Sequence, residues 1–76
     1  MKELLEFLVK SIVNHPQEVV VEEEREEDWL NLNLAANPED VKIIIGKKGR
    51  TIKALRELLK IKAIKDKVRV NLNLNQ

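Results

Sequence analysis

Two segments of the chain alternate apolar and polar residues with a period of two, which is the pattern of a strand with one buried face. The segment 29–36 places leucines between asparagines, and the segment 68–74 places valines and leucines between an arginine and asparagines. The run Asn-Leu-Asn-Leu occurs in both, at 31–34 and at 71–74. We therefore predict two strands of one sheet, with the leucines toward the core and the asparagines toward solvent.

Apolar residues at helical spacing predict a first helix over residues 2–13. Its expected core face is formed by five residues: Leu4, Leu5, Leu8, Val9 and Ile12. Asn14 and Pro16 should end this helix, because asparagine tolerates a left-handed cap and proline cannot continue the hydrogen-bond ladder. His15, between them, is expected to be a capping or solvated residue.

Two further helices are expected in the second half of the chain. Asn37 is a capping residue before Pro38 and two acids, so a short helix should start here and end at Gly46. A longer helix should run from Arg50 to about Ile64. Its predicted core stripe is Ile52, Leu55, Leu59 and Ala63, and its predicted exposed side carries Lys53, Arg56 and Lys60.

A β-branched cluster predicts one more strand over 18–24, before an acidic stretch at 22–28. Charges this dense cannot be buried, so we expect the acidic stretch to form the solvated end of a hairpin rather than a cation site. Trp29 follows this stretch and, in the alternation along the strand, falls on the same face as the asparagines. It should cover the outer sheet surface or contact a protein, with stacking on a nucleobase as the less favoured alternative.

Composition narrows the classes of function. The chain has 76 residues, no cysteine and one histidine, which argues against a disulfide framework, a zinc site and a Cys-His nucleophile. No carboxylate pair or activated nucleophile suggests catalysis, so we expect neither an enzyme nor a cofactor, metal or small-molecule substrate. We expect a single domain over 1–76 that is soluble and cytoplasmic and has no membrane partner.

The two signs of charge are separated along the chain. Residues 1–40 hold 3 Lys/Arg against 11 Asp/Glu, whereas residues 41–76 hold 11 Lys/Arg against 2 Asp/Glu. Such asymmetry is typical of proteins that bind nucleic acids or membranes. The folded domain should therefore present an acidic face and a basic face, unless folding mixes the charges into an even patchwork.

The only two glycines of the chain flank two lysines, in the stretch Gly46-Lys47-Lys48-Gly49. Glycine permits positive φ angles and close approach of a ligand to the backbone. The following helix directs its free N–H groups and positive dipole end toward this loop, so a phosphate is the expected ligand. The alternative is a plain turn between helices with solvated lysines.

Together with its apolar neighbours Ile45 and Ile52, this stretch resembles the Ile-Gly-x-x-Gly-x-x-Ile signature of KH domains. The element order α-β-β-α-α-β resembles the type II KH fold, an α+β domain with a three-stranded mixed sheet and three helices on one face. The start at residues 1–4, the helix stop at 14–16 and the helix start at 38–40 look like the KhpA family of small bacterial KH proteins. The commoner loop of that family is Gly-Lys-Gln-Gly, and the loop of this chain, Gly46-Lys47-Lys48-Gly49, is more basic.

The resemblance implies binding of single-stranded RNA, with about four nucleotides in a groove between the loop and the last strand. The residues expected to bind RNA are Ile45, Gly46, Lys47, Lys48, Gly49, Arg50, Ile52, Lys53 and Arg69, with Lys65 or Lys67 beside Arg69. Backbone N–H groups and cations would hold phosphates, and Ile45 and Ile52 would form an apolar wall for bases. Because the chain has few aromatic residues, binding should be weak and low in sequence specificity.

The long helix also carries a second apolar stripe, formed by Ala54, Leu58 and Ile61. Apolar residues on two sides of a helix indicate either deep burial or a partner, although the stripe also fits the edge of the core or the floor of a groove. The resemblance implies a homodimer or a heterodimer with a larger KH protein of the KhpB/Jag type. An assembly module, in which the fold mainly mediates dimerisation, is therefore the alternative function.

Overall fold

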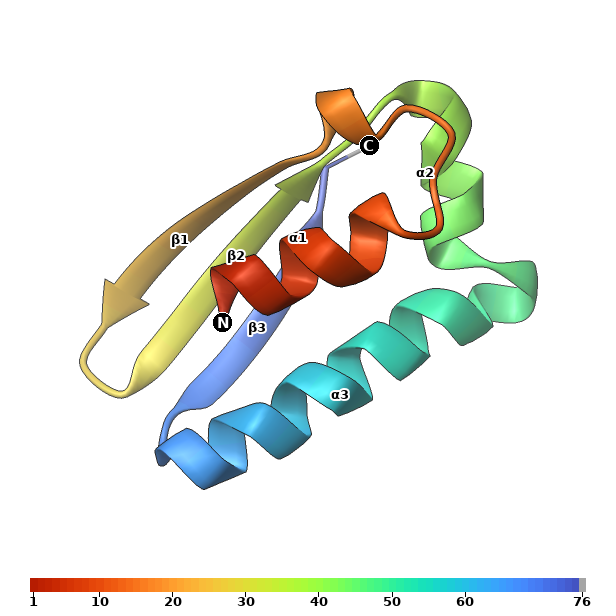
Figure 1. Cartoon of the computed structure of the whole chain (residues 1–76). Coiled ribbons are helices and arrows are strands. Elements are labelled where there is room, and N and C mark those ends of the chain that lie inside the picture. Colours follow the sequence, from red (N-terminus) through yellow and green to blue (C-terminus); the bar gives the residue numbers. More distant parts are fainter. Residues whose placement is uncertain (76) are drawn as a thin grey trace.

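The structure is a computed structural model that describes residues 1–75, so Gln76, the last residue of the expected domain, lies outside the described residues. Its main elements are α1 (Lys2–Lys10), β1 (Val20–Glu26), β2 (Trp29–Ala35), α2 (Pro38–Ile45), α3 (Arg50–Asp66) and β3 (Arg69–Leu74). Single 3₁₀ turns occur at Pro16–Glu18 and Lys47–Gly49. This order is the predicted α-β-β-α-α-β (Figure 1).

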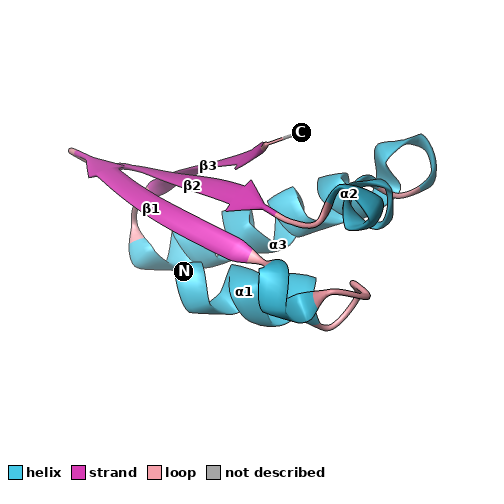
Figure 2. Cartoon of the chain, turned by 90° about the horizontal axis from the view of Figure 1, so that it is seen from above, coloured by secondary structure: helices cyan, strands magenta, loops and turns pink. Residues whose placement is uncertain are grey.

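The three strands form one mixed sheet in the order β1-β2-β3. β1 pairs with β2 antiparallel, and β2 pairs with β3 parallel. Seen from above, the helices lie on one face of this sheet and leave the other face open (Figure 2). The predicted α+β architecture is confirmed. None of the helices within residues 1–75 is long and apolar enough to span a bilayer.

The two Asn-Leu-Asn-Leu runs pair with each other residue by residue, as neighbouring strands of the sheet. On the open face, the amide of Asn71 donates to Asn31 Oδ1 at 3.0 Å, and that of Asn73 donates to Asn33 Oδ1 at 3.2 Å. On the covered face, the leucines of both runs face the helices, and Leu32 is fully buried. Because identical residues are in register, asparagines hydrogen-bond to each other on the solvent-exposed face while leucines face the helices on the covered face.

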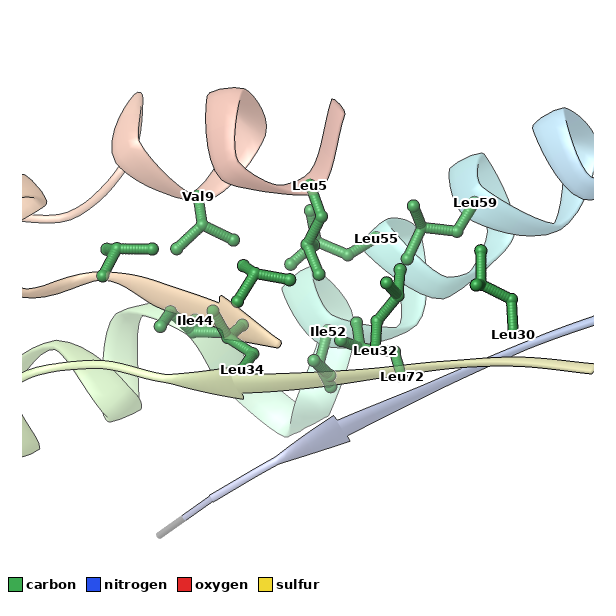
Figure 3. Close-up of a cluster of buried hydrophobic side chains, with 12 residues drawn as sticks. Leu5, Val9, Leu30, Leu32, Leu34, Ile44, Ile52, Leu55, Leu59 and Leu72 are labelled. Carbon is green, nitrogen blue, oxygen red and sulfur yellow. The ribbon is translucent and has the colours of Figure 1, made fainter. Parts of the chain in front are cut away.

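The core lies between the sheet and the helices (Figure 3). Leucines of β2 and β3 meet Leu5 and Val9 of α1, Ile44 of α2, and residues of α3. The predicted core stripe of α3 is confirmed, since each of its four members is buried: Ile52, Leu55, Leu59 and Ala63. This packing fixes the direction of α3 relative to the sheet and hence the position of the loop that precedes it.

The first helix is shorter than predicted, because α1 ends at Lys10 rather than at Val13. The hydroxyl of Ser11 donates to the carbonyl of Phe7 at 2.6 Å, and the N–H of Ile12 bonds to the carbonyl of Val9, which tightens the last turn. The placement of Ile12 on the core face was therefore wrong, since its side chain is 40% exposed.

The acidic stretch is not mainly a turn. β1 begins and ends two residues later than predicted and continues to Glu26, so that only Glu27 and Asp28 connect it to β2. β1 is an edge strand with an open outer face, and its glutamates remain exposed to water without leaving the strand. Exposure at a sheet edge allows charged residues to take part in β structure.

One buried carboxylate joins the start of α2 to the segment after α1. Asp40 is fully buried and accepts hydrogen bonds from the N–H of Asn14 at 3.2 Å, and from the N–H and Nδ1 of His15 at 2.9 and 3.0 Å. Burial alone raises the pKa of Asp40, but these hydrogen bonds outweigh it, so the pKa lies below its ordinary value of 3.8. His15, expected to be a capping or solvated residue, is half-buried against this carboxylate.

Candidate nucleic-acid interface

The connection between α2 and α3 contains three residues with positive φ angles, a conformation that favours glycine. Gly46, Lys48 and Gly49 have φ angles of 78°, 58° and 73°. A Cβ added to Gly46 would clash with Oγ1 of Thr51 and lie 2.8 Å from the backbone nitrogen of Thr51, so no side chain fits there. A Cβ on Gly49 would meet no atom within 4 Å, so only the positive φ favours glycine at that position.

The loop leaves cationic side chains and backbone donors available to a ligand. The N–H of Gly46 bonds to the carbonyl of Lys42 at 2.9 Å, and that of Gly49 bonds to the carbonyl of Gly46 at 3.1 Å. Within residues 1–75, the N–H groups of Lys47 and Lys48 have no protein acceptor. Both lysine side chains are exposed, and the loop lies at the edge of the molecule (Figure 1). This arrangement suits an anion.

The neighbours of the loop divide into exposed and buried residues. Arg50 and Lys53 are exposed on the first turn of α3, where they extend the positive charge. Ile45 is half-buried at the end of α2. The expectation that Ile52 forms an apolar wall for bases needs correction, since it is only 8% exposed and belongs to the core. Ile52 anchors α3 and thereby positions the loop.

A hollow of about 680 Å³ lies between α3 and the edge strand β3. Apolar residues of both elements line it, including Leu59, Ala63 and Val70. Cationic residues line it as well, and Arg56 donates from Nη2 to the carbonyl of Leu72 at 3.2 Å, joining helix and strand across it. The hollow thus combines an apolar lining with positive charge on the side of α3.

Arg69, the most distant predicted RNA-binding residue, lies at the other end of the hollow from the loop. It begins β3, which follows the 17-residue helix α3 of about 25 Å length. The structure therefore groups the residues from Ile45 to Lys53 at one end and places Arg69 at the other. Trp29 is the neighbour of Arg69 on β2 and also lines the hollow.

The prediction of binding residues omitted Arg56 and Lys60, which line the hollow. Their spacing from Lys53 already indicated a shared side of one helix. What was missing was the knowledge that this side faces β3. In the part of the chain that the structure describes, no three His, Cys, Asp or Glu residues are grouped to hold a metal ion.

The second stripe of α3 is exposed. Leu58 and Ile61 are 47% and 66% exposed, and Ala54 is exposed between the same turns. Phe7 on α1, which covers the same face of the sheet, is 69% exposed. The interpretation of this stripe as an edge of the core is therefore wrong, and it forms apolar surface on the helical side of the molecule.

A glycine-flanked cationic loop between two helices, packed with a third helix on one face of a mixed α-β-β-α-α-β sheet, defines a type II KH domain. The family model described as "KhpA/KhpB, KH domain" matches residues 2–74. The chain therefore belongs to the KhpA/KhpB family of KH domains. This is not a family of enzymes, as expected.

Named relatives cover almost the same length. The chain is 54% identical over 59 residues to "RNA-binding protein KhpA" of Thermotoga maritima, covering 78% of this chain and 79% of that protein. It is 44% identical over 70 residues to the protein of the same name from Clostridium perfringens, covering 92% and 93%. The corresponding protein of Chlamydia muridarum is 42% identical over 74 residues, covering 97% and 95%.

Proposed function

We propose that the protein binds single-stranded RNA at the Gly46–Gly49 loop and along the hollow between α3 and β3. The observation that carries this proposal is the loop itself, where exposed Lys47 and Lys48 accompany two backbone N–H groups that have no acceptor among the described residues. The name of the relatives, RNA-binding protein KhpA, supports RNA as the ligand. The proposal includes a cytoplasmic location.

The proposed mechanism assigns different tasks to the two parts of the site. The N–H groups and cations of the loop hold phosphates, with Arg50 and Lys53 extending the charge along α3. Bases lie toward Ile45 and the apolar lining of the hollow. Because phosphate contacts carry no sequence information, binding is low in sequence specificity. It is sensitive to salt because it depends on charge, and weak because few aromatic residues can stack on bases. The acidic edge at β1 repels the RNA backbone and favours one side of the domain.

Charge reversal of the loop tests the proposal. The variant Lys47→Asp/Lys48→Asp should lose binding of a labelled single-stranded RNA in a fluorescence-anisotropy titration, because both phosphate-binding cations become repulsive. The control Lys10→Asp/Arg25→Asp changes the net charge equally, and neither exposed residue lines the hollow. Equal affinity of the two double variants would contradict the proposal. Circular dichroism would show that each variant is folded.

The alternative function is assembly, in which the domain pairs with a second copy or with another KH protein. The exposed stripe of Ala54, Leu58 and Ile61 supports it, because contiguous exposed apolar residues often mark contacts between proteins. Sedimentation of the wild type and of Leu58→Glu tests it. A dimer in the wild type and a monomer in the variant would support assembly, whereas monomers in both would eliminate homodimerisation.

A further inference from the structure

The end of the hollow opposite the loop contains the only tryptophan of the chain. Trp29 and Arg69 are opposite each other in the register of β2 and β3, and Cζ of Arg69 lies 5.5 Å from the centre of the indole ring. Trp29 is 38% exposed, and Arg69 is exposed as well. An aromatic ring and a guanidinium plane, both accessible, are the two kinds of surface on which unpaired bases stack.

A line of positive charge connects this pair to the loop. Lys53, Arg56 and Lys60 are spaced by three and four residues on α3, so they share one side of the helix. Arg56 and Lys60 line the hollow, as do Trp29 and Arg69. An RNA strand held at the loop is therefore guided by charge toward the pair.

On the side of Trp29 away from Arg69, the charge favours a base over a phosphate. Glu26 is the partner of Trp29 on β1, on the side of β2 away from Arg69. A phosphate near the ring would meet this acidic edge, whereas a neutral base would not. The apolar residue Ile64, which is 69% exposed, lines the same end of the hollow and adds apolar surface for a base.

We infer that Trp29 and Arg69 form a base-stacking site for the same RNA strand that the loop holds by its phosphates. This inference rests on the proposed function and extends it, because the bound strand then runs the length of α3, about 25 Å. Stacking on this pair adds affinity that depends on the bases, whereas the loop binds the phosphates. Trp29 contacts the ligand, and its role is not limited to covering the sheet.

The test compares two labelled 12-nucleotide ligands, one RNA with normal bases and one in which every nucleotide is abasic. Wild type, Trp29→Leu and Trp29→Phe are titrated with both. Trp29→Leu should bind the normal RNA at least about fivefold more weakly, the lower end of what base–aromatic stacking contributes. It should bind the abasic strand as the wild type does, and Trp29→Phe should retain most of the affinity for normal RNA.

A second readout uses the intrinsic fluorescence of Trp29. The normal RNA should change this fluorescence on binding, and the abasic strand should leave it nearly unchanged. Equal affinity of wild type and Trp29→Leu for the normal RNA would overturn the inference while leaving the proposed function intact. An equal loss for both ligands would also overturn it, because the substitution would then act on structure and not on stacking. Failure of the wild type to bind either ligand would overturn both proposals.

Discussion

The two glycines of the loop have different physical reasons for being glycine. Gly46 faces Thr51 so closely that a methyl group has no room, whereas Gly49 faces open space and only its φ of 73° disfavours other residues. The sequence predicted the pair as one motif. It did not distinguish the positions, because the contact between Gly46 and Thr51 depends on the angle at which α3 leaves the loop.

Alanine substitutions should separate these two effects. Gly49→Ala should lower the free energy of unfolding by about 1 to 2 kcal/mol, the cost of a left-handed residue with a side chain. Gly46→Ala should cost more, because the clash with Thr51 adds to the same backbone strain. Urea denaturation of both variants measures the difference. A smaller loss for Gly46→Ala than for Gly49→Ala would contradict the described loop geometry.

Asp40 should give the protein a pH-dependent stability. Because hydrogen bonds hold its pKa in the folded state below 3.8, its contribution is present above pH 3.8 and is lost as the pH falls through the lower, folded-state value. Asp40→Asn should be less stable than the wild type at pH 7. Thermal melts should show this difference shrinking below about pH 4. Ser11→Ala is the control that leaves the pH dependence intact, because the Ser11 hydroxyl bonds to the carbonyl of Phe7 and to no titratable group. A pH-independent difference would contradict the role of the charged carboxylate.

At the scale of elements, sequence patterns predicted the buried faces of helices and strands, which have a periodic pattern. They did not predict features that depend on local contacts. The core stripe of α3 and the paired Asn-Leu runs of β2 and β3 followed from periodicity, because one buried face imposes a regular pattern. The early end of α1 coincides with a local contact, in which the Ser11 hydroxyl donates to the carbonyl of Phe7. The glutamates can lie in a strand because β1 is at the edge of the sheet. Neither the end of α1 nor the strand conformation of the glutamates produces a periodic pattern in the sequence.

Adjacent leucines of α3 provide a matched test of this packing. Leu59 is fully buried and Leu58 is 47% exposed. Leu59→Ala should lower the free energy of unfolding by about 2 to 5 kcal/mol, because it leaves a cavity in the core. Leu58→Ala should change it by about 0.5 kcal/mol or less at concentrations where the protein is monomeric. Chemical denaturation measures both, and similar losses would contradict the assignment of the two faces.

At the scale of the whole molecule, the separation of charge along the chain becomes a separation in space. The acidic strand β1 and the strand β3 are opposite edges of the sheet, and the basic helix α3 packs beside β3. The loop was predictable because its glycines and lysines are adjacent in sequence. The resemblance implied a groove beside the last strand, but its lining was not predictable, because the residues of the hollow come from β2, α3 and β3 and meet only after folding.

This charge arrangement predicts a defined salt dependence. With about three to five phosphate contacts, the logarithm of the RNA association constant should fall with the logarithm of salt concentration at a slope of about −2 to −3.5. Lys47→Ala/Lys48→Ala should make the slope less steep by about 1.4, since two contacts are removed. Titrations at several salt concentrations measure it. An unchanged slope would show that these lysines do not contact phosphate.

The central claim is the location of the RNA, and nuclear magnetic resonance tests it most directly. Isotope-labelled protein is titrated with a 12-nucleotide single-stranded RNA while backbone amide shifts are followed. We predict the largest changes at the N–H groups of Lys47 and Lys48, with further changes along the side of α3 that faces β3. Changes confined to β1 or α1, with the loop unaffected, would contradict the account.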